Sequence, residues 1–149
     1  SYPICIVAYG TSGTQYIMAT PTGVSGESVW KVVGGSASAI TPNDGVSDGL
    51  GVSPNCIAMA SGIETHIVGI FSFGGVRKVA YSSNGGASWA FNTQVSNAAS
   101  YIRMIRVGTL YYVAVCDGDT LWWAVWTGTG TLMLYAKTAP QMLGGFEFR

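Results

Sequence analysis

The side chains best suited to acid–base chemistry in this sequence are its seven carboxylates. Two carboxylates facing each other across a sugar could cleave a glycosidic bond, one as the acid and the other as nucleophile or base. Most of them, however, stand in polar contexts such as N-D-G and D-G-D, where Asp and Gly form tight turns. We therefore predict no catalytic residue and no enzyme activity. The seven are Glu27, Asp44, Asp48, Glu64, Asp117, Asp119 and Glu147.

Histidine and cysteine are the other residues that could do chemistry. His66 begins an apolar run and has no serine or cysteine in a nucleophile elbow near it. Cys5, Cys56 and Cys116 form no C-x-x-C pair, and we expect all three to be reduced and buried in strands. A zinc site needs about four convergent ligands. We predict neither a metal nor any other cofactor.

Aromatic side chains make up 12% of the chain and are the remaining candidates for binding. Sugars are recognised by aromatic faces together with a few polar groups. Trp122 and Trp126 beside Asp119 are therefore our candidate ligand-binding residues, as a shelf for a glycan. The alternative is that the two rings belong to the core between sheets.

Composition limits the class of protein. Seven Lys and Arg balance seven Asp and Glu, which excludes nucleic-acid binding driven by bulk charge. Hydrophobic residues reach 48% and charged residues only 9%, which predicts one folded domain of 149 residues. The longest apolar runs, such as 111–116 and 121–126, are far shorter than the roughly 18 residues of a membrane span. We expect no membrane insertion and see no targeting segment.

Glycines punctuate the chain into short runs rich in Val, Ile, Tyr and Trp, which is typical of strands joined by hairpins. No segment keeps a helical period, so we predict an all-β fold. The run 121–126 is apolar on both faces, with Trp123 on one side and Trp122 on the other. Such a strand should be covered twice, which favours sheets stacked on further sheets, as in a propeller or a tight sandwich.

Internal repetition favours the propeller. Residues 3–40, 56–95 and 101–137 repeat a pattern of apolar strands and Gly-rich turns, at a length close to the roughly 40 to 50 residues of a propeller blade. We interpret 34–54 as a loop insertion and expect the first repeat to lack its innermost strand. The alternating segment 144–149 is the candidate closing strand.

A turn motif carries a resemblance to a known family. Residues 82–89 read S-S-N-G-G-A-S-W and match the pattern S/T-x-D/N-x-G-x-x-W at Ser82, Asn84, Gly86 and Trp89. The segment resembles the Asp-box, or BNR repeat, of Asp-box β-propellers, and degenerate copies stand in the other two repeats. We expect Asn84 to bond its own loop backbone, Gly86 to take a positive φ, and Trp89 to pack under the turn. These boxes are structural, so we assign them no ligand.

The resemblance implies a fold of three blade-like antiparallel sheets and several functions. The family includes sialidases, other glycosidases, lectin-like binders, and virion or photosystem-assembly proteins. A sialidase needs three arginines that clamp a carboxylate, and none of the four arginines here lies in the family's arginine motif. We therefore expect a non-enzymatic structural or adhesion module, such as a phage tail, fibre or decoration component, or a glycan-binding lectin. The alternatives are a subunit or fragment of an Asp-box glycosidase and a β-sandwich capsid-decoration protein.

Three blades are fewer than the roughly four to eight of a closed ring. We therefore expect a homo-oligomer, most simply two chains giving a six-bladed ring, with Phe146 and Phe148 packing on the partner's first sheet. A three-sheet prism that closes on itself is the alternative. The expected partners are further copies of the chain and a surface glycan, and the expected location is a virion or the extracellular space.

Overall fold

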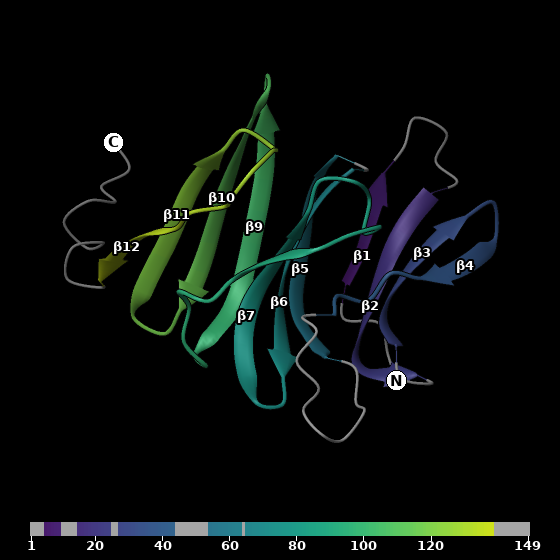
Figure 1. The fold of residues 1–149 in the computed structure, drawn as a ribbon, viewed down its shortest axis with the longest axis horizontal. Helices are drawn as coiled ribbons and strands as arrows, with labels where there is room; N and C mark the ends of the chain where they lie inside the picture. Colours follow the sequence, from purple (N-terminus) through teal and green to yellow (C-terminus); the bar gives the residue numbers. More distant parts are fainter. Residues whose placement is uncertain (1–4, 10–14, 25–26, 44–53, 64, 139–149) are drawn as a thin grey trace.

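The computed structural model describes residues 5–9, 15–24, 27–43, 54–63 and 65–138. Every regular element within these residues is a β-strand, so the all-β prediction is confirmed. The strands form three antiparallel sheets of four strands each (Figure 1). None of the described residues forms a helix that could cross a membrane.

Each sheet is a simple meander in which consecutive strands are neighbours. The first sheet contains β1 (Cys5–Tyr9), β2 (Gln15–Val24), β3 (Glu27–Val33) and β4 (Ser36–Ala39). The second contains β5 (Asn55–Ile63), β6 (His66–Phe73), β7 (Val76–Ser82) and β8 (Ala90–Asn92). The third contains β9 (Ala99–Val107), β10 (Leu110–Asp117), β11 (Thr120–Trp126) and β12 (Tyr135–Thr138).

The first sheet corrects one expectation from the sequence, because the first repeat does not lack a strand. Its fourth strand, β4, lies within the segment that we interpreted as a loop insertion and pairs with β3 from Trp30 opposite Ala39 to Val33 opposite Ser36. Serine and alanine have little strand preference of their own, and β4 is exposed along its whole length. Backbone pairing with β3 forms this strand without an apolar pattern. The predicted closing strand 144–149 lies outside the described residues.

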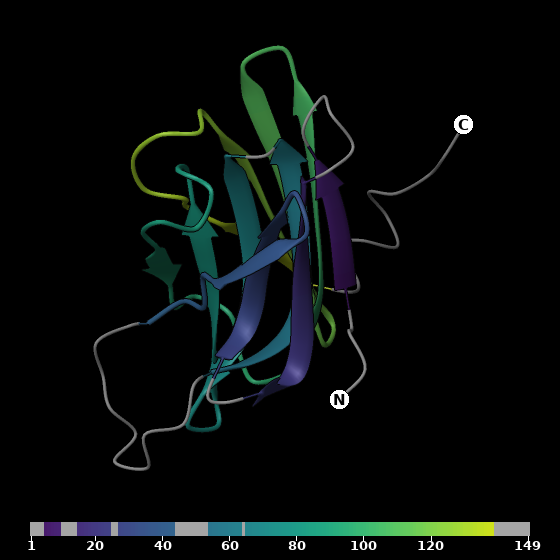
Figure 2. The ribbon, with the colours of Figure 1, turned by 90° about the vertical axis from the view of Figure 1, so that its right-hand side faces the viewer.

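The second sheet lies between the other two. Figure 1 shows the third, second and first sheets in a row from left to right, and Figure 2 views the row from the side of the first sheet. β5 lies against β9 on one side and against β1 and β2 on the other. The three sheets therefore do not form a prism closed on itself in the described part of the chain.

Strand β6 shows why the second sheet is central. Its apolar residues are consecutive, so both of its faces must be covered. Ile67 and Phe71 belong to the core that includes Ile17 and Val29 of the first sheet. Val68 and Ile70 belong to the core that includes residues of the third sheet. Full burial of such a side chain contributes roughly 1.5 to 3 kcal/mol, so β6 holds both cores together. The members of the second core from the third sheet include Ile102, Val113, Val115 and Trp126.

The third sheet is packed on one face only, which corrects the expectation that β11 is covered on both. Ala124 and Trp126 are buried, whereas Trp123 and Val125 are 41% and 46% exposed. The reason is its place in the row: the second sheet covers one face of β11, and no described residue provides a further sheet for the other.

Candidate functional site: the outer face of the third sheet

The candidate site is the face of the third sheet that points away from the second sheet, called here the outer face. Side chains alternate along β9, β10 and β11, and directly paired residues share a face. The pairs place Arg103 beside Ala114, and Ala114 beside Trp123. Trp123 pairs with Tyr135 of β12. The outer face consists of Tyr101, Arg103, Ile105, Val107, Leu110, Tyr112, Ala114, Cys116, Leu121, Trp123, Val125, Tyr135 and Lys137.

Exposed apolar side chains gather on this face. Ten large hydrophobic side chains of the described residues are exposed, and all but Val33, Val76 and Met133 belong to the outer face. Ile105 and Tyr135 are the most exposed of them, at 61% and 59%. Contiguous apolar patches of this kind mark contact surfaces, because water-exposed apolar area is otherwise unfavourable.

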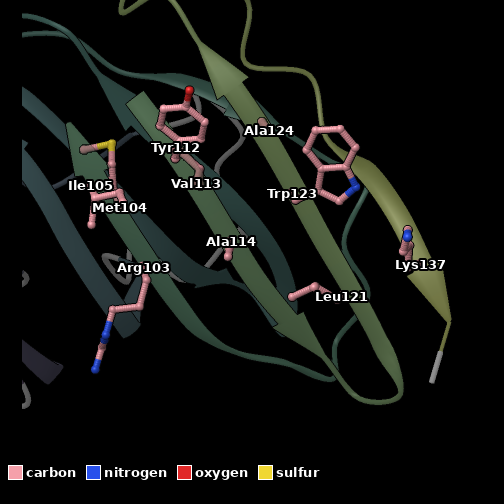
Figure 3. Close-up of a pocket in the computed structure, with 10 residues that line it drawn as sticks. All are labelled: Arg103, Met104, Ile105, Tyr112, Val113, Ala114, Leu121, Trp123, Ala124 and Lys137. Carbon is pink, nitrogen blue, oxygen red and sulfur yellow. The ribbon is translucent and has the colours of Figure 1, made fainter. Parts of the chain in front are cut away.

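The centre of the outer face is an open hollow of about 510 Å³. Its floor includes Ala114, whose small side chain lies between the larger Arg103 and Trp123 on the neighbouring strands. Figure 3 shows Tyr112 and Trp123 rising from the sheet at one end and Lys137 on β12 at the side. The hollow follows directly from this register, because a small residue is flanked by large ones on both sides.

The charges around the hollow are positive. Arg103 and Lys137 line it together with apolar and aromatic residues, and no carboxylate is part of its lining. The Arg103 guanidinium lies 4.0 Å from the centre of the Tyr101 ring, a cation–π geometry, and donates to the carbonyl of Ile102 at 3.1 Å. A chain of zero net charge therefore presents two cations on a mostly apolar surface.

The structure places the predicted glycan shelf on the opposite face of β11. Trp126 is buried, and its indole N–H donates to the carbonyls of Thr129 and Gly130 at 3.2 and 3.3 Å. Trp122 is half-buried against the core between the second and third sheets. Asp119 is exposed in the turn before β11. The three do not form one exposed stacking surface; Trp123, the residue between the two tryptophans in the strand, does face outward.

Asp117 is the buried carboxylate of the third sheet. It accepts hydrogen bonds from the Ser96 hydroxyl, from the Ser96 N–H at 2.8 Å and from the Trp122 indole N–H at 2.9 Å. Burial alone would raise the pKa of Asp117, but these hydrogen bonds and the nearby charge of Arg77 outweigh it and hold the pKa below its ordinary value. A carboxylate with three donors is an anchor for the segment between the second and third sheets.

The turn that resembles an Asp-box has the geometry expected of it. The Ser82 hydroxyl oxygen accepts the N–H of Gly86 at 2.9 Å, and the side-chain amide oxygen of Asn84 accepts the N–H of Ser88 at 2.9 Å. Gly86 has a φ of 85°, as predicted. A Cβ there would also lie 2.7 Å from the Ile40 side chain, so glycine is required on two grounds.

Trp89 joins this turn to the first sheet. Its indole N–H donates to the carbonyl of Ile40 at 2.8 Å, and its ring meets the Phe71 ring edge-on at 6.0 Å between centres. Ile40 in turn packs against the core between the first and second sheets. Trp89 therefore holds the first sheet against the second, which agrees with the structural role that the sequence suggested for it.

His66 is fully engaged in packing. One ring nitrogen is 2.8 Å from the Thr65 hydroxyl, and the other is 2.9 Å from the carbonyl of Gly128. The imidazole stacks on Tyr111 with ring centres 4.3 Å apart. Both nitrogens thus have partners, and the ring links β6 to the segment after β11.

The cysteines differ from the prediction that all three are buried. Cys56 is buried, but Cys116 is exposed on the outer face, and the side chain of Cys5 lies outside the description. The sequence prediction failed at Cys116 because apolar neighbours occupy both faces of β10, and only one of those faces is packed. No group of three or more His, Cys, Asp or Glu side chains that could hold a metal occurs among the described residues.

This difference gives a testable expectation. Cys116 should react with a maleimide without unfolding of the chain, whereas Cys56 should react only after denaturation, because the folded core shields its thiol. Timed labelling followed by peptide mass spectrometry measures both rates. Labelling of Cys56 in the native protein at the rate measured after denaturation would contradict its assigned burial.

The chain matches no known protein-family model, and no curated protein matches it in sequence. Sequence reasoning missed Arg103, Ile105, Tyr112, Trp123 and Lys137 as site residues. The apolar pattern on both faces of 121–126 could have indicated them, because only one of those faces packs in the core and the other is exposed.

Proposed function

We propose that the chain is a non-enzymatic structural or adhesion module of the β-propeller type that works through the outer face of its third sheet. The observation that carries the proposal is the concentration of exposed apolar and aromatic side chains on that face. Proteins that assemble or adhere need such a surface, and they need no acid–base pair. A virion component or an extracellular lectin-like protein fits this description.

Three features support the propeller type. The three sheets are successive four-stranded meanders. Their first strands, β1, β5 and β9, lie side by side, as the innermost strands of neighbouring blades do (Figure 1). In the turn at residues 82–89 the Asn84 side chain bonds its own loop backbone, as the Asp-box resemblance implies. Closure by oligomerisation or by a C-terminal strand is part of the proposal.

The proposal excludes a sialidase-like activity. Asp117 already accepts three hydrogen bonds, and Asp119 is an exposed turn residue. Incubation with fluorogenic sialosides and related glycosides should give no turnover above the buffer rate. Turnover that survives purification, and that is lost on replacing one of these carboxylates, would contradict the proposal and favour an Asp-box glycosidase.

The contact role of the outer face has its own test. Ile105→Glu places a charge on the most exposed apolar residue of the face and should abolish the module's self-association or its saturable binding to a glycan panel. Val76→Glu is the matched control, because Val76 is 54% exposed at the start of β7, outside the outer face. Association and glycan binding that are both insensitive to Ile105→Glu would refute the proposed function.

A further inference from the structure

We infer that the outer face is covered by the first sheet of a second copy of this chain, so that copies associate head to tail. The inference rests on the proposed function and names its partner. It starts from the packing that the chain already uses within itself.

Within the chain, sheets are added in one direction. The second sheet covers one face of the first, and the third sheet covers the opposite face of the second, with β6 contributing to both cores. Adding one more sheet in the same direction would place a four-stranded sheet against the outer face of the third sheet. A contact between two different surfaces of identical copies closes into a ring when the rotation allows it.

The first sheet has a face available for this contact. Val29 of β3 packs toward the second sheet, and Trp30 and Val32 alternate with it, so they lie on the face turned away, where Trp30 is half-buried and Val32 is 5% exposed. Trp30 is paired with Ala39 and Val32 with Ala37 of the exposed strand β4. Trp30 beside the small, exposed residues of β4 offers an aromatic ring to a surface whose hollow is floored by a small residue, Ala114.

The available area favours a closed pair of chains over a single contact. Four strands about 4.8 Å apart and about seven residues long, at about 3.3 Å per residue, give a sheet face of roughly 440 Å² in projection. A stable interface buries about 800 Å² on each partner. A two-chain ring contains two such contacts, and each chain contributes both its outer face and its first sheet.

A glycan is the other occupant that the aromatic rings and the two cations could suit. The hollow, however, is lined mainly by aliphatic and aromatic atoms, with Arg103 and Lys137 as its charged groups. The lining therefore offers a sugar few polar groups for direct hydrogen bonds, and affinity from stacking alone would be small. The apolar face of a sheet needs no such hydrogen bonds, so a second copy fits better.

The test uses two single variants and their mixture. Ile105→Glu blocks the outer face, and Ala37→Glu blocks the free face of the first sheet; both positions are exposed, so both chains should fold. Native mass spectrometry and sedimentation should give a two-chain mass for the unaltered protein and for Val76→Glu, and a one-chain mass for each blocking variant. An equimolar mixture of the two blocking variants should form a one-to-one dimer only at higher concentration than the unaltered chain, because the mixture retains one of the two contacts whereas either variant alone retains none.

Other outcomes separate this inference from the proposed function. If Ala37→Glu remains a dimer while Ile105→Glu does not, outer faces pair with each other, and the head-to-tail inference is wrong. If the unaltered chain is a monomer that binds a glycan through Ile105 and its neighbours, the inference is again wrong and the proposed function stands. Circular dichroism establishes that the variants are folded, and Ile105→Lys and Ala37→Lys replace any that are not.

Cys116 provides an independent readout of the same contact, since it lies on the outer face beside Leu121. Its alkylation should be severalfold slower in the assembled protein than in Ile105→Glu at the same concentration. Equal rates in the two proteins would show that no second copy covers this part of the face.

Discussion

Replacing Trp89 by alanine is expected to lower the free energy of unfolding by about 3 kcal/mol, the lower end of the range for truncating a packed tryptophan. The lower end applies because the ring is half-buried. The substitution removes the edge-on contact with Phe71 and leaves the Ile40 carbonyl without its donor. For a domain of this size the melting temperature should fall by roughly 6 to 12 °C. Urea titration and thermal unfolding measure both quantities.

A matched control shows whether the loss of stability comes from the packing of Trp89 or would follow the removal of any tryptophan. Trp123→Ala, made in the Ile105→Glu background so that assembly does not contribute, removes an exposed indole and should change stability by less than about 1 kcal/mol. An unchanged melting temperature in Trp89→Ala would overturn the role of Trp89 in joining the first sheet to the second. It would also remove the local support for the Asp-box resemblance.

The second large effect is expected at Asp117. Asp117→Ala removes the charged acceptor of the Ser96 and Trp122 N–H groups, and a hydrogen bond to a charged group contributes roughly 1.5 to 3 kcal/mol. The combined loss of stability at neutral pH should be about 3 kcal/mol. Asp119→Ala is the control, because Asp119 is exposed in the adjacent turn and its removal should leave stability unchanged.

Asp117 also predicts how stability depends on pH. The pKa of its carboxyl is lowered in the folded chain, so the folded state favours the charged form more than the unfolded state does. The stabilisation is therefore complete above the unfolded pKa of about 3.9 and is lost as the pH falls below that value through the folded pKa. Unfolding free energies measured from pH 6 to pH 2.5 should fall less steeply for Asp117→Asn than for the unaltered chain. Parallel curves would contradict the assigned hydrogen bonds.

The sequence predicted strands and turns correctly where residues close together in the chain determine the local structure. The apolar run that became β6 and the Ser82–Gly86 turn depend on side chains close in the chain, and both appear as expected. Strand β4 was not readable, because its serines and alanines pair through backbone groups with a partner whose position depends on the tertiary fold.

The candidate site shows the same division. The alternation of residues 121–126 determined, from the sequence alone, that Trp122 and Trp126 share one face of a strand and that Trp123 lies on the other. Only the tertiary structure decided which of these two apolar faces packs on the second sheet, because either would bury a similar area. Packing placed Trp126 in the core and left Trp123 on the outer face. The exposed apolar face of this protein therefore follows from the place of its third sheet at the end of a row of sheets, a property of the whole fold that no local pattern encodes.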